Sequence, residues 1–159
     1  MRKENDQLKN TVQNLESKQP TYKVEELATI DDEFKATIKY TVRSQYSSSE
    51  EHKTIKTTWG EIFSMIAPDL LEHPSDGSVN FKLGSALYRK SNPKSDKTVQ
   101  VVHDDFQTIK TQFMALNLID VRYSQTTKGG MGLFWTLSKT GMDLMLRLRT
   151  IKKNIQPDS

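Results

Sequence analysis

The stretch Thr126–Trp135, TTKGGMGLFW, places three glycines within four positions and then becomes apolar. A phosphate-binding P-loop needs the spacing G-x-x-x-x-G-K-[ST] between a strand and a helix, so that backbone N–H groups face the anion. Here Lys128 precedes the glycines, and a predicted strand follows them. Glycine readily adopts the positive φ angles of a hairpin loop. The stretch therefore predicts the tip of a β-hairpin, with strands over 120–124 and 133–137.

Three helices are expected before this hairpin, and local signals predict the first two. Thr58 and Glu61 have the spacing of a capping box, which predicts a helix that begins at Thr58. Pro68 lacks a backbone donor and is expected to end that helix near residue 67. Ser78 is expected to cap the second helix, over 79–90.

The third and fourth helices lie on either side of the predicted hairpin. Apolar residues at helical spacing predict the third helix over 104–119, with Asp104 as its cap and Gln107 as the reciprocal partner. The fourth helix is expected to begin near Thr140 and to continue through Ile155.

One strong strand is expected upstream of these helices. Residues 34–42 alternate apolar and polar side chains, which is the pattern of a half-buried strand. The serine-rich stretch 44–53 is interpreted as a turn or loop, and 54–58 as a short return strand. Residues 19–33 are interpreted as a linker.

Residues 1–18 have the spacing of a short coiled coil. Met1, Leu8 and Leu15 fall at heptad position d, and Asn5 and Val12 fall at position a. Pairing of two copies through Asn5, Leu8, Val12 and Leu15 is one expectation. A solvated terminal helix is the equal alternative, because so short a helix is marginal in water.

The order of helix, helix, helix, hairpin and helix resembles the winged helix-turn-helix domain. The likeness rests on ALNLI (115–119), on the hairpin and on the step TLSKTG (136–141), which is similar to the strand-to-helix junction of MarR-like and PadR-like bacterial regulators. The resemblance implies an α+β fold: a winged-helix domain over 34–156 with an extra N-terminal strand, a short N-terminal coiled-coil helix and a tail over 157–159.

A closer likeness is carried by TTWGEIFSMIAP (57–68) and DDFQTIKTQFMALNLI (104–119). These stretches resemble the C-terminal module of bacterial proteins with a domain of unknown function and a TIR-like N-terminal effector domain. The sequence leaves open whether the 159 residues are a fragment of such a larger protein. The likeness does not by itself transfer a signalling or defence role to this chain; an interaction module of such a bacterial system belongs to the alternative, protein-directed function.

In winged helices that bind DNA, the third helix enters the major groove and the wing reaches nearby phosphates. The resemblance therefore implies a surface that binds duplex DNA, formed by the solvent-facing side of the third helix and by the wing. Against it, Asp104 and Asp105 lie at the leading end of the helix, and few cations are available. A protein-protein or oligomerisation module without nucleic-acid binding is the alternative. The implied nucleic-acid-binding residues are Thr108, Lys110, Thr111, Gln112, Arg122 and Lys128.

The candidate catalytic groups are scattered along the sequence, which favours a binding function over catalysis. The chain has 159 residues, a net charge of +3 and no cysteine, which excludes disulfides and thiolate chemistry. His52, His73 and His103 do not share metal-ligand spacing, so neither a metal nor a cofactor is expected. The first residues carry no apolar leader, and no long apolar run follows. A cytoplasmic, non-enzymatic protein is therefore the expectation.

Overall fold

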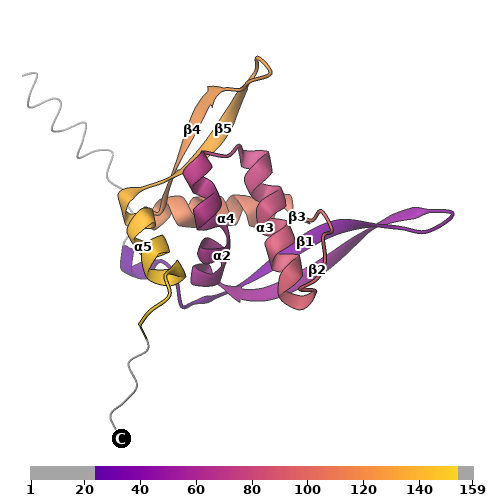
Figure 1. The fold of residues 1–159 in the computed structure, drawn as a ribbon, viewed down its shortest axis with the longest axis horizontal. Coiled ribbons are helices and arrows are strands. Elements are labelled where there is room, and N and C mark those ends of the chain that lie inside the picture. Colours follow the sequence, from indigo (N-terminus) through magenta and orange to yellow (C-terminus); the bar gives the residue numbers. More distant parts are fainter. Residues whose placement is uncertain (1–23, 154–159) are drawn as a thin grey trace, which may run out of the picture.

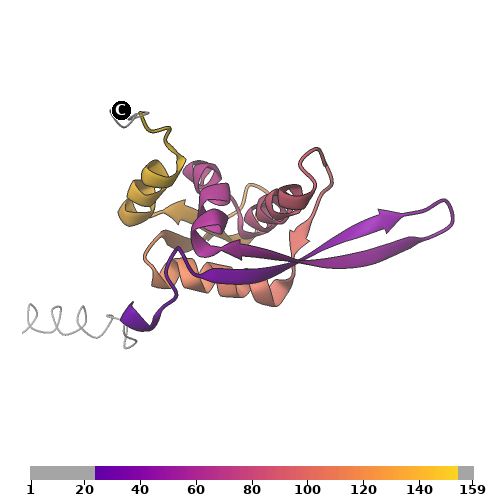
Figure 2. The same cartoon turned by 90° about the horizontal axis from the view of Figure 1, so that it is seen from below.

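The computed structural model describes residues 24–153, which form a mixed α+β fold (Figure 1). Two β-ribbons project from a body of helices, and one of them extends far beyond the rest of the molecule (Figures 1 and 2). The predicted coiled-coil residues Asn5, Leu8, Val12 and Leu15, and the tail 157–159, lie outside the described residues, so both stay predictions. In chain order the elements are η1 (Val24–Glu26), β1 (Glu33–Arg43), β2 (Ser48–Thr58), α2 (Trp59–Ile66), η2 (Ala67–Glu72), α3 (Asp76–Ser91), β3 (Gln100–Val101), α4 (His103–Ala115), β4 (Ile119–Gln125), β5 (Met131–Leu137) and α5 (Lys139–Arg149).

The longer ribbon consists of β1 and β2, paired antiparallel from Glu33↔Thr58 to Arg43↔Ser48. The predicted strand is confirmed, and Ala36 and Ile38 are fully buried. The prediction of a loop over 44–53 is wrong beyond residue 47, because β2 already begins at Ser48. The outer half of β2 is exposed to solvent and carries no apolar alternation, so its sequence gives no strand signal.

A third strand, β3, lies beside β1 and completes a sheet of order β2-β1-β3. Its two residues, Gln100 and Val101, pair with Lys39 and Ile38. β4 and β5 form a separate antiparallel hairpin, as the sequence predicts. Gly129 at the turn has a φ of 98°, which matches the role expected of the glycine-rich tip.

The first helix, α2, begins where the capping box predicts. The Thr58 hydroxyl accepts the Glu61 N–H at 3.2 Å. The Glu61 carboxylate binds Thr57 and Lys90, in place of the reciprocal bond to Thr58 that a full capping box would have. α2 ends at Ile66 and continues as the 3₁₀ helix η2 over Pro68.

The second helix, α3, begins three residues before the predicted position. Ser75, and not Ser78, is the cap, and its hydroxyl accepts the Ser78 N–H at 3.3 Å. Both serines precede the apolar stripe, and Gly77 between them favours a loop, so the sequence alone points to the later serine. Asp76 in the first turn is favoured there by the helix dipole.

The third helix, α4, is shorter than predicted. Asp104 does not cap it: Val102 is the residue before the helix, and no side chain caps the end. The helix ends at Ala115 because Asn117 adopts a φ of 57°, and the Leu118 N–H then bonds the Phe113 carbonyl at 2.9 Å. Ile119, the residue after Leu118, therefore begins β4 instead of continuing the helix.

The fourth helix, α5, is capped by Ser138, whose hydroxyl accepts the Gly141 N–H at 2.9 Å. It ends at Arg149, so the predicted continuation through Ile151 is wrong; Ile151 is 99% exposed. The sequence pattern predicts a longer helix because Ile151 has helical spacing from the preceding apolar residues, although its side chain packs against no other described residue. Ile155 lies outside the described residues.

One apolar core joins the helices to both sheets. Trp59 and Phe63 meet Phe113 edge to face, with ring centroids 6.2 and 5.5 Å apart, and Phe106 stacks on Trp135 at 5.5 Å. Because Trp135 belongs to β5, the base of the β4–β5 hairpin is part of the core. The isolated bridge between Ser75 and Phe134 joins β5 to the start of α3 in addition.

The approach of α5 to the end of α4 requires a glycine. A methyl group added at Gly141 would lie 1.9 Å from the Leu118 carbonyl oxygen, a backbone atom that cannot move aside. A methyl group added at Gly77 in α3 would meet nothing within 4 Å.

We therefore expect Gly141→Ala to lower the free energy of unfolding by about 1–3 kcal/mol or more, because overpacking displaces the backbone. Gly77→Ala, the matched control, should leave it unchanged or raise it by up to about 1 kcal/mol. Urea unfolding of the two variants measures both effects. Equal stability of the two variants would contradict the close approach of α5.

Candidate interaction surface

The surface formed by α4 and the β4–β5 hairpin is where the sequence predicts binding residues. We call this hairpin, residues 119–137, the wing after the role that the sequence predicts for it. α4 buries Phe106, Ile109 and Phe113 in the core. The opposite side of α4 is exposed to solvent and carries polar side chains, one histidine, one acid and one methionine. No lysine or arginine of α4 lies on this side. These exposed residues are His103, Asp104, Gln107, Thr108, Thr111 and Met114.

Lys110 does not lie on the solvent side of α4, which corrects the prediction. Its side chain is 10% exposed, and its Nζ lies 2.9 Å from Oδ1 of Asp76. The same carboxylate oxygen accepts the Trp135 Nε1–H at 2.8 Å, and the Lys110 Nζ lies 5.3 Å from the Phe106 ring centroid. The ammonium group therefore joins α4 to Asp76 of α3, and the same carboxylate joins α3 to β5.

The other predicted residues of α4 are divided between two roles. Thr108 and Thr111 are exposed, as predicted, and the Thr108 hydroxyl donates to the Asp104 carbonyl at 3.0 Å. Gln112 is half-buried, and its side-chain amide donates to the Ala28 carbonyl at 3.1 Å. Gln112 thus holds the segment before β1 against α4 and is not directed at a partner.

The start of α4 is attached to the sheet by an acid. Oδ2 of Asp105 accepts the Thr37 N–H of β1 at 2.7 Å. Asp104 in the same first turn is exposed. The leading end of α4 therefore presents a carboxylate, which would repel DNA phosphates.

The wing carries the two remaining predicted cations. Arg122 and Lys128 are exposed, and neither forms an ion pair with another described residue. Arg122 lies on β4 opposite Phe134, and Lys128 lies in the turn. Of the six predicted residues, the structure thus leaves four exposed, two on α4 and two on the wing.

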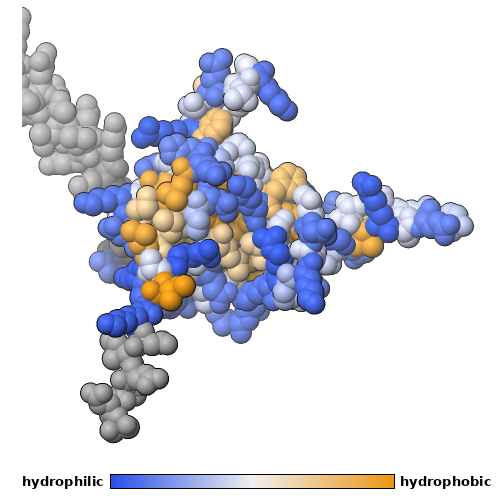
Figure 3. Space-filling model, in the orientation of Figure 1, coloured by the Kyte–Doolittle hydropathy of each residue, from blue (hydrophilic) through white to orange (hydrophobic). Residues whose placement is uncertain are grey.

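An apolar face of the wing is not among the features predicted from the sequence. Tyr123 pairs with Leu133, and Gln125 pairs with Met131, so these side chains share the ribbon face of the buried Trp135. Tyr123 is 68% exposed, Leu133 37% and Met131 51%. In Figure 3 a small apolar area is visible near the base of the β4–β5 ribbon, whereas the tips of both ribbons are mainly hydrophilic to neutral. The alternation of 131, 133 and 135 is the signal that could have indicated it.

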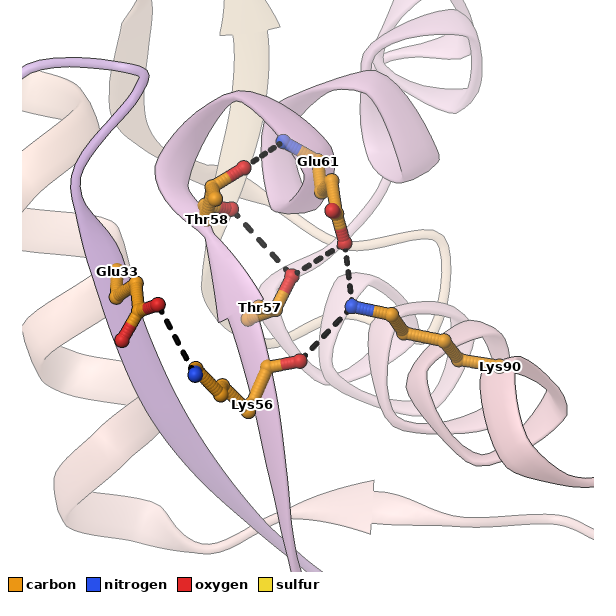
Figure 4. A network of polar contacts seen from close by, with 6 residues as sticks. All are labelled: Glu33, Lys56, Thr57, Thr58, Glu61 and Lys90. Atoms are coloured by element: carbon orange, nitrogen blue, oxygen red, sulfur yellow. Dashed lines mark hydrogen bonds and ion pairs between the residues drawn. The ribbon is translucent and has the colours of Figure 1, made fainter.

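Glu61 is the one described group whose pKa is clearly displaced. Its carboxylate accepts hydrogen bonds from the Lys90 ammonium at 2.6 Å and the Thr57 hydroxyl at 3.0 Å, and Lys90 also donates to the Lys56 carbonyl at 2.8 Å (Figure 4). The hydrogen bond from Lys90 is the main cause that lowers the pKa of Glu61. The network connects β2, α2 and α3. A carboxyl that acts as a general acid at neutral pH needs a raised pKa, so the lowered pKa of Glu61 does not resemble that of an acid–base catalyst.

The described residues contain no group of three or more His, Asp or Glu side chains that could hold a metal ion. Within the same residues, no helix combines the length and the apolar character needed to cross a lipid bilayer. Comparison with models of protein families finds no match for the chain, and a search of curated proteins finds none either.

The lowered pKa of Glu61 predicts a specific loss of stability in acid. A carboxyl whose pKa is depressed by folding stabilises the protein above the unfolded pKa, here near 4.5, and this contribution is lost as the pH falls through the lower folded value. We expect the melting temperature of the native chain to fall below about pH 4.5 more steeply than that of Glu61→Gln. Lys90→Met should flatten the pH dependence in the same way. Parallel curves for all three proteins would contradict this role of the network.

The position of Lys110 predicts that reversing its charge damages the fold. Lys110→Glu places a second carboxylate against Asp76, where the Lys110 side chain is 10% exposed and the Asp76 side chain 31%. Breaking a fully buried pair typically costs about 3–5 kcal/mol, and we expect a smaller but clear loss of stability here because solvent partly screens Asp76. Lys128→Glu, the exposed control on the wing, should leave the free energy of unfolding within about 0.5 kcal/mol of the native value. If thermal unfolding of the two variants were alike, Lys110 would not be held in the interior.

Proposed function

We propose that this chain is a non-enzymatic protein-interaction module of the winged-helix type. The face of the wing formed by Tyr123, Met131 and Leu133, which we call the wing face, contacts the protein partner. The observation that carries the proposal is the exposure of these three apolar side chains on one side of a projecting ribbon. Aromatic residues and methionine are enriched in the centres of protein interfaces.

The order of elements supports the winged-helix assignment. Three helices, α2, α3 and α4, precede the hairpin β4–β5, and α5 follows it. The bridge between Ser75 and Phe134 supplies a short strand-like contact between the second helix and the wing. The long β1–β2 ribbon is an addition to this arrangement.

Charge favours a protein partner over duplex DNA. Residues 103–137 contain Lys110, Arg122 and Lys128 against Asp104, Asp105 and Asp120, so α4 and the wing have no net charge. Lys110 is in addition withdrawn into the interior. Proteins that bind duplex DNA gain affinity by neutralising several phosphates, for which this surface provides few cations.

Duplex DNA is the second candidate, because Arg122 and Lys128 are exposed on the wing without an ion-pair partner among the described residues. In winged helices that bind DNA, the wing is a phosphate-contacting element. A titration of random duplex DNA at low salt separates the two candidates. We expect the chain not to bind the duplex. Binding that weakens with salt and is lost in the double variant Arg122→Gln, Lys128→Gln would instead favour DNA as the partner.

Site-specific photocrosslinking tests the protein contact directly. A photoreactive residue at Tyr123 or Leu133 should form a discrete crosslinked product with a protein in cells that produce the chain. Ser124, on the opposite face of the same ribbon, is the matched control and should form none. Equal crosslinking from the two faces, or none from the wing face, would contradict the proposal.

A further inference from the structure

The edge of β1 that faces β3 is only partly covered. β3 pairs with β1 at Ile38 and Lys39 alone. On the same edge, the Thr37 carbonyl accepts the Val102 N–H at 2.9 Å, and the Thr37 N–H donates to Asp105 at 2.7 Å. Beyond Lys39, no described segment pairs with this edge.

The backbone groups of two further residues face the same open edge. In an antiparallel strand, alternate residues direct both their N–H and C=O to the same side. Since Thr37 directs its groups toward β3, Thr41 and Arg43 do so as well. Continuing the ladder would place Thr98 opposite Thr41, but β3 begins only at Gln100. An open strand edge of this kind is a template for pairing with another chain.

Positive charge surrounds this open edge. A hollow of about 410 Å³ lies beside it and is lined by Lys39, Arg43 and Lys97, together with Glu50. None of the three cations forms an ion pair with a described residue, whereas Glu50 lies 3.3 Å from His52. The Lys97 ammonium lies over the Tyr40 ring, 4.9 Å from its centroid.

The hollow also contains an exposed aromatic ring. Phe81 of α3 lines it and is 42% exposed. α3 packs on the Tyr40 side of β1, since the rings of Tyr40 and Tyr88 lie 4.9 Å apart. Alternation places the side chains of Lys39 and Arg43 on the opposite face of the strand. A strand added at this edge would therefore meet Lys39 and Arg43 on one face, and the Phe81 ring together with Lys97 on the other.

We propose that this edge binds an extended acidic segment of a protein partner by β-strand addition. The segment pairs its backbone with Thr41 and Arg43. Its acidic side chains face Lys39 and Arg43, and the apolar side chains between them face Phe81. This mode takes affinity from main-chain hydrogen bonds and specificity from alternate side chains. The site is separate from the wing face and does not depend on it.

A designed peptide tests this binding without knowledge of the natural partner. The probe is a fluorescein-labelled octapeptide that alternates glutamate and valine, added to the full chain and followed by fluorescence anisotropy. We expect saturable binding, and none by the matching peptide that alternates lysine and valine. Absence of glutamate–valine peptide binding at low salt would overturn the proposal.

Proline substitution distinguishes strand addition from simple charge attraction. Thr41→Pro removes an N–H that faces the open edge while the β1–β2 ladder keeps its hydrogen bonds, so it should weaken peptide binding at least about tenfold. His52→Pro is the matched control, because His52 lies opposite Lys39 and directs its N–H to the outer edge of β2. Equal loss in both variants, with both shown to be folded by circular dichroism, would overturn the proposal.

Charge variants test which cations contact the peptide. The double variant Lys39→Gln, Arg43→Gln should weaken binding at least about tenfold, whereas Lys35→Gln, on the same strand face but outside the hollow, should not. An oligothymidylate probe provides the last comparison. If it bound as tightly as the peptide and Thr41→Pro left it unaffected, the surface would be a general polyanion site and the proposal would fail.

Discussion

The carboxylate of Asp76 is the contact on which the arrangement of α3, α4 and the wing depends. One of its oxygens accepts the Trp135 indole N–H at 2.8 Å and the Lys110 ammonium at 2.9 Å. These two donors come from β5 and α4, so a single side chain at the start of α3 fixes both elements. Asp76 is half-buried, and a carboxylate withdrawn from water in this way is tolerated because it is both paired and hydrogen-bonded. The same contact removes from the surface the cation that a DNA-reading helix would need.

Much of the fold could be predicted from the sequence, because local signals and tertiary packing agree there. The alternation over 34–42, the cap at Thr58 and the glycine-rich tip each predict an element that the structure contains. The outer half of β2 could not be predicted, because its strand conformation comes from pairing with β1 and not from any apolar face. The caps at Ser75 and Ser138 could not be identified because several hydroxyl and acidic residues compete for each position.

The candidate surface is less predictable than the fold. A charged residue such as Lys110 is expected in solvent, although its spacing from Phe106 and Phe113 places it on the buried side of α4. The burial of a charge depends on a partner from another helix, and Asp76 cannot be recognised as that partner from the sequence. The apolar alternation of 131, 133 and 135 is visible, but only the structure shows that the core ends at Trp135 and leaves the outer two side chains exposed.

These observations separate the structural charges of the molecule from those available to a partner. Lys110 and Lys90 hold elements together, whereas Lys39, Arg43 and Lys97 remain without carboxylate partners among the described residues. Amine acetylation of the native protein, followed residue by residue by mass spectrometry, tests this separation most directly. The account predicts that Lys110 is acetylated far more slowly than Lys128, and that the difference disappears in urea. Equal rates at Lys110 and Lys128 in the native protein would contradict it.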